Sequence, residues 1–186
     1  MGNTKGLTLQ NYVSFVRERA TEESFEAVLA RLSPPARDML GDAALTPMSW
    51  VPYACVVDFL RAADAVLGTG DGALLFEASH ANQLRNVNGV YRSLLPLIST
   101  SFLIERASRL WRRYHDTGEM HCLERDAGTL KVELRAYPDL PAGHAPEIEG
   151  AFVALMEMAK AKDIEVAHTK CVLGGDGQCT WRLRWS

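Results

Sequence analysis

The sequence predicts an α+β fold in which N-terminal helices pack on a small antiparallel sheet, built from two hairpins that a helix separates. Apolar residues recur at helical spacing through about the first 115 positions. Beyond them the apolar spacing changes to two, which is typical of half-buried strands, and glycine-rich turns separate the segments. Because hairpin strands pair antiparallel, the sheet is expected to present one face to the helices.

The composition is that of an ordinary globular chain. Of 186 residues, 47% are hydrophobic and 23% charged, so one domain spanning 1–186 is expected, helical over about 6–117 and carrying the sheet and last helix over about 118–186. A net charge of -3 favours neither nucleic acid nor an acidic membrane as partner. No apolar run reaches the roughly 20 residues that membrane insertion requires. The first residues lack a secretory apolar segment, so we expect a cytoplasmic protein with free or metal-bound cysteines.

Three helices are expected first. Leu7 to Val16 form one apolar helical face. Thr21 caps a second helix, which Pro34-Pro35 is expected to end. Ser49 is expected to cap the third, which Gly68 closes.

The later helices lead to the sheet. A weaker helical pattern covers 71–84, and a further apolar helix begins at Gly89 and is kinked by Pro96. Ser99 to Ser101 cap the helix that Gly118 stops. That helix is expected to pack its apolar residues across the sheet: Phe102, Leu103, Ala107, Leu110, Trp111 and Tyr114.

Four strands follow. The spacing predicts strands over Met120–Glu124, Thr129–Tyr137, Ile164–Val172 and Cys179–Trp185, with a helix over Pro146–Lys162 between the hairpins. The inward positions of the second and fourth strands are apolar: Leu130, Val132, Leu134, Trp181 and Leu183.

The last hairpin carries the most informative pattern. Cys171 and Cys179 lie eight apart across a glycine-rich turn, and pairing around Gly175 would set them opposite each other, with Cβ atoms about 5 Å apart. Two such thiolates can share a zinc ion. His168 falls on the other face of a regular strand, so its participation requires a bulge. His144, before the last helix, is the fourth candidate ligand. The alternative is that the cysteines are small buried hydrophobes.

The element order and the closing Cys-x2-Gly-x4-Cys motif resemble the 4-vinyl reductase domain. That domain shares its fold with the haem nitric-oxide-binding domain and with Golgi transport subunits of a vesicle-tethering complex. It also forms the sensor half of bacterial regulators that respond to phenol and xylene. The whole length also resembles a myxobacterial family of unassigned function.

The resemblance implies a zinc site. In the aromatic sensors the ligands are the two hairpin cysteines, a Glu three residues before the first, and a Cys before the preceding helix. Cys171 and Cys179 match directly. His168 stands in the position of the Glu and His144 close to that of the outlying Cys, and zinc accepts both substitutions.

We expect no haem. The haem branch of this fold holds iron through a histidine on a long central helix and clamps the propionates with a Tyr-x-Ser-x-Arg run. This sequence has no such run, and Ser101–Tyr114, the counterpart helix, has no histidine before His115.

Two functions remain open. The first is a small-molecule sensor in signalling or regulation, with a cavity between sheet and helices that binds an apolar or aromatic ligand through Tyr91, Phe102, Trp111 and Tyr114. These aromatics could instead fill the core. The second is a protein-interaction or scaffolding domain. A homodimer formed through the N-terminal helices is expected, as in the transport relatives. No catalytic motif is present, so we expect a binding domain rather than an enzyme.

Overall fold

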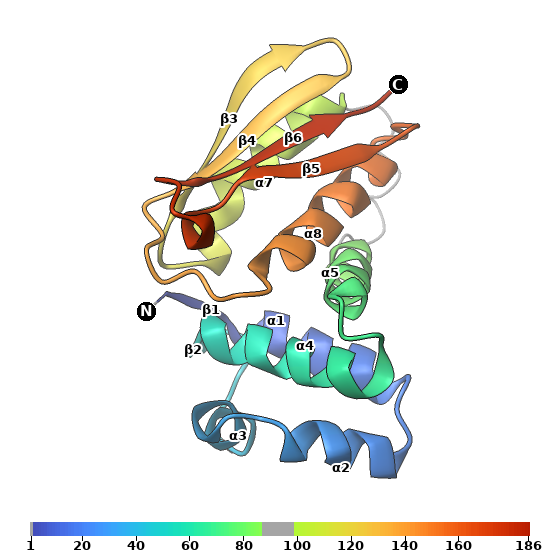
Figure 1. Cartoon of the computed structure of the whole chain (residues 1–186), viewed down its shortest axis with the longest axis vertical. Helices are drawn as coiled ribbons and strands as arrows, with labels where there is room; N and C mark the ends of the chain where they lie inside the picture. Colours follow the sequence, from blue (N-terminus) through green and yellow to red (C-terminus); the bar gives the residue numbers. More distant parts are fainter. Residues whose placement is uncertain (1, 87–98) are drawn as a thin grey trace.

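The computed structural model describes residues 2–86 and 99–186, except the side chains of Ala107, Leu110 and Arg125. The expected helix at Gly89, the kink at Pro96 and the predicted ligand residue Tyr91 lie outside the described residues. Figure 1 shows a half of helices below and a half above in which helices cover a sheet. This arrangement confirms the predicted α+β class.

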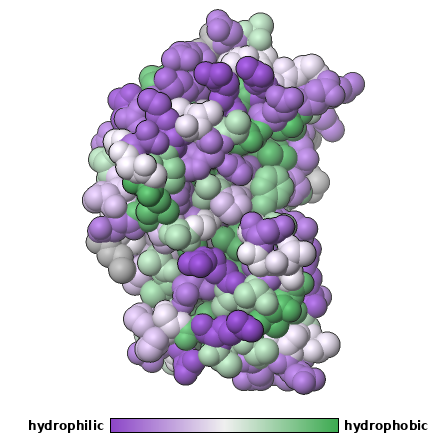
Figure 2. Space-filling model, in the orientation of Figure 1, coloured by the Kyte–Doolittle hydropathy of each residue, from purple (hydrophilic) through white to green (hydrophobic). Residues whose placement is uncertain are grey.

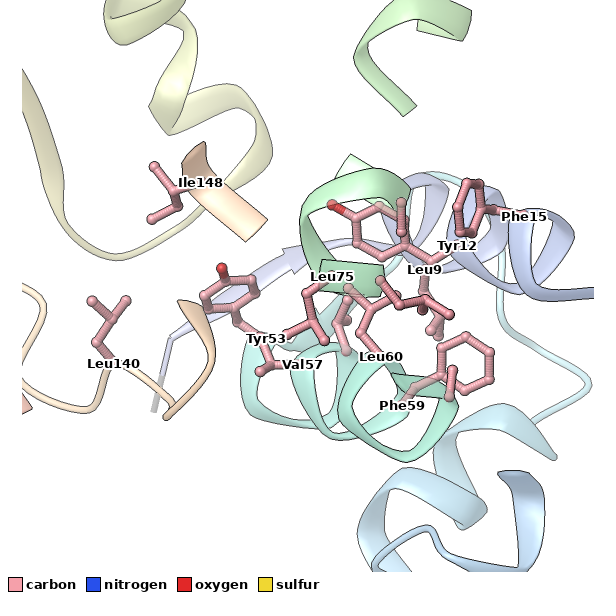
Figure 3. Packing of buried hydrophobic residues seen from close by; sticks show 14 of the residues in the cluster. Leu9, Tyr12, Phe15, Tyr53, Val57, Phe59, Leu60, Leu75, Leu140 and Ile148 are labelled. Carbon is pink, nitrogen blue, oxygen red and sulfur yellow. The ribbon is translucent and has the colours of Figure 1, made fainter. Parts of the chain in front are cut away.

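The lower half contains five described helices and a short two-stranded sheet. The helices are α1 (Gly6–Arg17), α2 (Glu22–Ala30), α3 (Pro34–Leu40), α4 (Tyr53–Leu67) and α5 (Ala73–Asn86). The strands β1 (Asn3–Lys5) and β2 (Trp50–Pro52) pair antiparallel and lead into α1 and α4. Figure 3 shows Leu9 of α1 directed toward Phe59 and Leu60 of α4, and these three residues are almost completely buried, as are Tyr12 and Phe15 of α1.

Helix ends follow local chemistry, with two departures from expectation. The Thr21 hydroxyl accepts from the Ser24 amide at 3.2 Å, which confirms the cap of α2. Pro34-Pro35 was expected to end the second helix, but α2 ends earlier, at Ala30. The two prolines instead begin α3, because proline needs no amide in a first turn. Ser49 is not a cap, since β2 intervenes and α4 begins at Tyr53.

The upper half contains the four-stranded antiparallel sheet in the order β3-β4-β6-β5. Its strands are β3 (Glu119–Asp126), β4 (Thr129–Arg135), β5 (Glu165–Lys170) and β6 (Cys179–Arg184). They form two hairpins separated by helix α8 (His144–Met158), as predicted. The predicted inner face is confirmed, because all five of its apolar side chains are at most 1% exposed: Leu130, Val132, Leu134, Trp181 and Leu183.

Helices α8 and α7 (Thr100–Tyr114) cover the inner face of the sheet. Phe152 of α8 meets Trp181 edge to face at 5.9 Å between ring centroids. On α7, the Ser108 Oγ lies 3.2 Å from the Cys122 Sγ of β3. Ser99 caps α7 by accepting from the Phe102 amide, as expected.

The expected inner face of α7 was partly wrong. Thr100, Ile104 and Ser108 are buried and Trp111 is half-buried, whereas Phe102 is 55% and Tyr114 41% exposed. The buried residues follow each other at helical spacing of three or four, and Phe102 lies on the opposite side. Two of the buried positions, Thr100 and Ser108, are polar, so a search for apolar residues did not include them.

Helix α8 also packs on α5, which joins the two halves. An added Cβ at Gly150 would lie 2.2 Å from the Phe76 carbonyl oxygen, so the two helix backbones touch there. Among the described residues, no helix has the length and apolar character needed to cross a bilayer.

Candidate metal centre

Four side chains, three from the turn end of the last hairpin and one from the start of α8, converge at one edge of the sheet. They are His144, His168, Cys171 and Cys179, and each offers one ligand atom that lies within 4.8 Å of the other three. We call this group the His–Cys cluster. The structure thus brings together all four residues that the sequence nominated for a metal. His144 comes from α8, His168 from β5, Cys179 from β6 and Cys171 from the loop between the two strands.

A register shift in β5 explains how His168 enters the cluster. His168 pairs with Trp181, but Lys170 pairs with Thr180, so Thr169 is an extra residue on this strand. Without it, His168 and Cys171 would face opposite sides. The Thr169 hydroxyl donates to the Thr180 carbonyl at 3.2 Å, which anchors the bulge. The imidazole of His168 therefore lies on the inner face, stacked on Trp181 with centroids 4.6 Å apart.

His144 is held by the loop before α8. Gly143 has φ 101, a left-handed conformation that favours glycine, and the chain turns there into the helix. The His144 Nδ1 donates to the Pro141 carbonyl at 2.8 Å. This bond fixes the tautomer and leaves Nε2 as the lone-pair donor. Nε2 lies 3.4 Å from the Cys179 Sγ and 4.0 Å from the Cys171 Sγ.

The glycine-rich loop positions the two sulfurs. The carbonyl of Cys171 accepts from the Gly174 and Asp176 amides, and the Asp176 carboxylate accepts from the Cys171 amide at 2.8 Å. The Val172 amide points at the Cys179 Sγ, 3.5 Å away. Amide donors directed at sulfur are the arrangement that stabilises a thiolate ligand.

Burial favours the uncharged forms of His144, His168 and Cys179. The side chains of His144 and Cys179 are almost fully buried. Desolvation lowers the pKa of His144 to about 4 and also lowers the pKa of His168, and it raises the pKa of the Cys179 thiol to about 11. Within the described part of the chain, the buried Nε2 of His168 has no hydrogen-bond partner. Such an atom is costly unless something binds it.

The cluster fits a tetrahedral zinc ion. With Zn–S near 2.3 Å and Zn–N near 2.0–2.1 Å, a tetrahedron sets nitrogen and sulfur ligands roughly 3.5 Å apart. The separations of 3.4 and 4.0 Å from His144 Nε2 to the two sulfurs bracket this value. Two thiolates with two imidazoles are a ligand set that zinc accepts, and four protein ligands leave no open position.

The described residues that were expected to bind a small ligand do not gather around one site. Trp111 donates its Nε1 to the Thr117 carbonyl at 3.0 Å and stacks on His115 at 3.8 Å between centroids. Phe102 and Tyr114 stand on the exposed surface of α7. Among the described residues, two open pockets lie elsewhere. One is beside the α4–α5 loop, and the other is between α1, α2 and α3.

Sequence reasoning missed a buried carboxylate beside the metal centre. Glu147 is on the same first turn of α8 as His144, and its two oxygens accept from the hydroxyls of Tyr12 and Tyr53. All three side chains are buried. The signal in the sequence was the position of Glu147, directly before Ile148 on the apolar side of the helix. An acidic side chain that is buried there requires a hydrogen-bond partner.

Comparisons with known proteins bear on the fold. No family model matches this chain, and no curated protein matches its sequence. Solved structures do match: an H-NOX protein from K. algicida in the Fe(II) unliganded state (TM-score 0.72, 12% identity, covering 98% of this chain and 96% of that one). An H-NOX protein from S. oneidensis in the Fe(II)NO state matches with a TM-score of 0.70 and 9% identity, over 98% of this chain and 99% of that one. An oxygen-binding H-NOX domain related to soluble guanylate cyclases, in its oxygen complex, matches with a TM-score of 0.63 and 11% identity, over 98% of this chain and 95% of that one. The chain therefore has the haem-nitric-oxide-binding fold.

Proposed function

We propose that this chain is a sensory domain of the haem-nitric-oxide-binding fold that holds structural zinc in place of haem. The observation that carries this proposal is the His–Cys cluster, in which four ligand atoms lie within 4.8 Å of one another. The resemblance to the 4-vinyl reductase sensors supports it, because their zinc ligands occupy the corresponding positions.

The role of the ion would be to hold elements together. Cys171 and Cys179 would supply thiolates and His144 and His168 neutral imidazoles, and a closed four-ligand site cannot activate water. His144 begins α8, while the other three belong to the last hairpin. Zinc would therefore fix the first turn of α8 to the sheet. The same turn carries Glu147, which bonds to α1 and α4. One ion would thus stabilise the junction between both halves.

The residues present do not fit a haem held through a helix histidine. No histidine occurs in the sequence between His80 and His115. The Nε2 of His80 is 2.6 Å from a Glu157 carboxylate oxygen. His115 follows the end of α7, with its ring stacked on Trp111 and its edge against Tyr53 at 5.1 Å. Neither of the two pockets described above reaches it. These contacts support a haem-free protein.

A small apolar molecule remains the proposed signal. Of the fold relatives, one is named as an Fe(II)NO complex and another as an oxygen complex, and the sensing relatives of the 4-vinyl reductase type respond to aromatic compounds. One observation favours the alternative of an interaction domain. The aromatic side chains of Phe102 and Tyr114 lie on the exposed face of α7, where a protein partner could cover them.

Metal analysis tests the proposal. Protein purified without chelators should contain one zinc ion per chain and show no Soret absorption. Cys179→Ser should reduce the zinc content to near zero. The matched control is Cys122→Ser, which removes a thiol of the same sheet outside the cluster and should leave zinc unchanged.

Native mass spectrometry of the same sample reports metal, retained ligand and oligomeric state together. Protein that folds without zinc, or that contains haem, would contradict the metal proposal. A chain that carries zinc and only ever appears with a protein partner would favour the interaction domain.

A further inference from the structure

An open groove lies between α1, α2 and α3, away from the metal centre and from the sheet. Its volume is about 720 Å³. Its apolar wall is built from Val13 of α1, Phe25 and Leu29 of α2, and Leu40 of α3. Val13, Leu29 and Leu40 are only half-buried, so they offer apolar surface that nothing in the described chain covers. Figure 2 shows green apolar surface between purple polar groups in the lower part of the molecule, where Figure 1 places these helices.

Two arginines stand at the groove. The guanidinium of Arg17 lies over the Phe25 ring, 4.0 Å from its centroid. Arg37 directs its Nη2 at the carbonyls of Ala30 and Leu32, at 3.2 and 3.4 Å. Glu26 also lines the groove, yet within the described residues it forms no ion pair with either arginine. The groove therefore has a net positive charge beside an apolar wall.

We infer that this groove binds a single-chain amphiphilic carboxylate, with its apolar tail on Val13, Leu29 and Leu40 and its carboxylate at Arg17 and Arg37. Guanidinium groups match a carboxylate with paired donors, and a bound acid would supply a negative charge opposite the two arginines. The inference goes beyond the proposed function, because this groove is separate from Phe102, Trp111 and Tyr114 and would take an amphiphilic acid rather than an apolar molecule.

The size of the groove favours a small molecule over a protein partner. Pockets that enclose small ligands have volumes of roughly 300–1,000 Å³, and this groove falls inside that range. A stable protein interface needs roughly 800 Å² from each partner, which extends well beyond the few side chains that line this site.

Binding of sodium decanoate, below its micelle concentration, tests the inference by calorimetry. Saturable binding of one decanoate per chain is expected, and decyltrimethylammonium, with the same tail and opposite charge, should bind at least about tenfold more weakly. Arg17→Gln should weaken decanoate binding by up to about fivefold, the upper end of the range for one exposed charge contact. Ala30→Trp, which places an indole in the groove, should abolish binding.

Arg19→Gln is the matched control. Arg19 also lies over a phenylalanine, Phe15, at 3.6 Å, but it does not line the groove, so its loss should leave decanoate binding unchanged. Zinc content and thermal unfolding, measured on every variant, show that the fold is intact. This also separates the two proposals, because zinc-loaded protein that ignores decanoate would overturn only this inference.

Three other outcomes would overturn the inference. Equal affinity for the anionic and cationic amphiphiles would mean that the arginines do not contribute to ligand recognition. Equal effects of Arg17→Gln and Arg19→Gln would place the site elsewhere. Binding to phosphatidylglycerol vesicles without binding of soluble decanoate would assign the groove to a membrane surface.

Discussion

At the scale of single residues, Glu147 is the buried acid at the junction of the two halves. It accepts hydrogen bonds from Tyr12 and Tyr53, which belong to α1 and α4. Burial raises the pKa of the Glu147 carboxyl, and the two tyrosine hydrogen bonds lower it by less. Burial, together with this carboxylate, holds the pKa of both tyrosines well above their usual value, so their hydroxyls stay protonated and continue to donate.

We predict that Glu147→Gln changes how stability depends on pH. A carboxyl whose folded pKa is raised contributes stability that is fully present below its unfolded pKa, near 4.5, and is lost as pH rises through the folded pKa. The unfolding free energy of the wild type minus that of the variant should therefore fall from about pH 4.5 toward neutrality. Urea unfolding at a series of pH values measures it.

Glu22→Gln is the control for this experiment. Glu22 is exposed in the first turn of α2, far from the junction that Glu147 holds together. A wild-type advantage that grows with rising pH would show that the carboxylate, rather than the acid, is the stable form in the folded protein.

The metal ligands show which residue-level features the sequence can and cannot provide. The residue spacing predicted that Cys171 lies opposite Cys179, and it indicated that His168 can join them only if the strand contains a bulge. The structure contains that register shift, at Thr169. The position of the shift was not predictable, because a threonine in a polar strand carries no mark of being unpaired. Glu147 was missed because burial of an acid depends on tyrosines more than 90 residues away in sequence.

At the scale of elements, the contact between α5 and α8 depends on a glycine. Gly150 lies inside α8, where alanine would ordinarily be about 1 kcal/mol better for the helix. Here an added methyl group would lie 2.2 Å from the Phe76 carbonyl and 3.1 Å from the His80 amide. These are backbone atoms of α5 and cannot swing away.

We therefore predict that Gly150→Ala destabilises the protein, by about 1–3 kcal/mol or more, as overpacking does. The sign is opposite to that expected from helix propensity. Denaturant unfolding measures the change. Gly174→Ala is the matched control, because nothing lies within 4 Å of an added Cβ there and the change should be close to neutral. A stabilised Gly150→Ala variant would mean that α5 and α8 separate at little cost.

Element prediction succeeded where a local signal was sufficient. Thr21 and Ser99 cap their helices as expected, and the period-two pattern of β4 and β6 gave the inner face of the sheet. It failed where the signal had two meanings. Pro34-Pro35 can stop one helix or start the next. Here α2 already ends at Ala30, and the prolines start α3. The strands β1 and β2 are three residues long, too short to show a period.

At the scale of the whole molecule, self-association remains a prediction. The expected homodimer would use the N-terminal helices, and an interface that persists in solution should bury on the order of 1,000 Å² or more. Light scattering at high micromolar concentration should give twice the mass of one chain. A monomer at that concentration would contradict the prediction, and the alternative of a scaffolding domain would lose its main mechanism.

The molecule is also organised around one chain of contacts that runs from the sheet to the lower helices. The His–Cys cluster joins β5 and β6 to the first turn of α8, Glu147 on that turn joins α1 and α4, and Gly150 lets α8 lie against α5. Loss of the proposed ion should therefore act on this junction before it acts on the outer helices α2 and α3, which pack on α4.

We predict that zinc removal lowers the stability of the whole chain but opens it locally first. An ion that binds only the folded state contributes RT ln(1 + [Zn]/Kd), about 4 kcal/mol at a thousandfold excess over Kd. Chelation should thus lower the melting temperature. Hydrogen exchange should then speed up in β5, in the loop 171–178 and in the first turn of α8, while α2 and α3 keep their protection. The variant Cys179→Ser should show the same pattern without chelator and no further response to it. Exchange that rises evenly over all helices, or not at all, would show that the cluster does not hold the hairpin to α8.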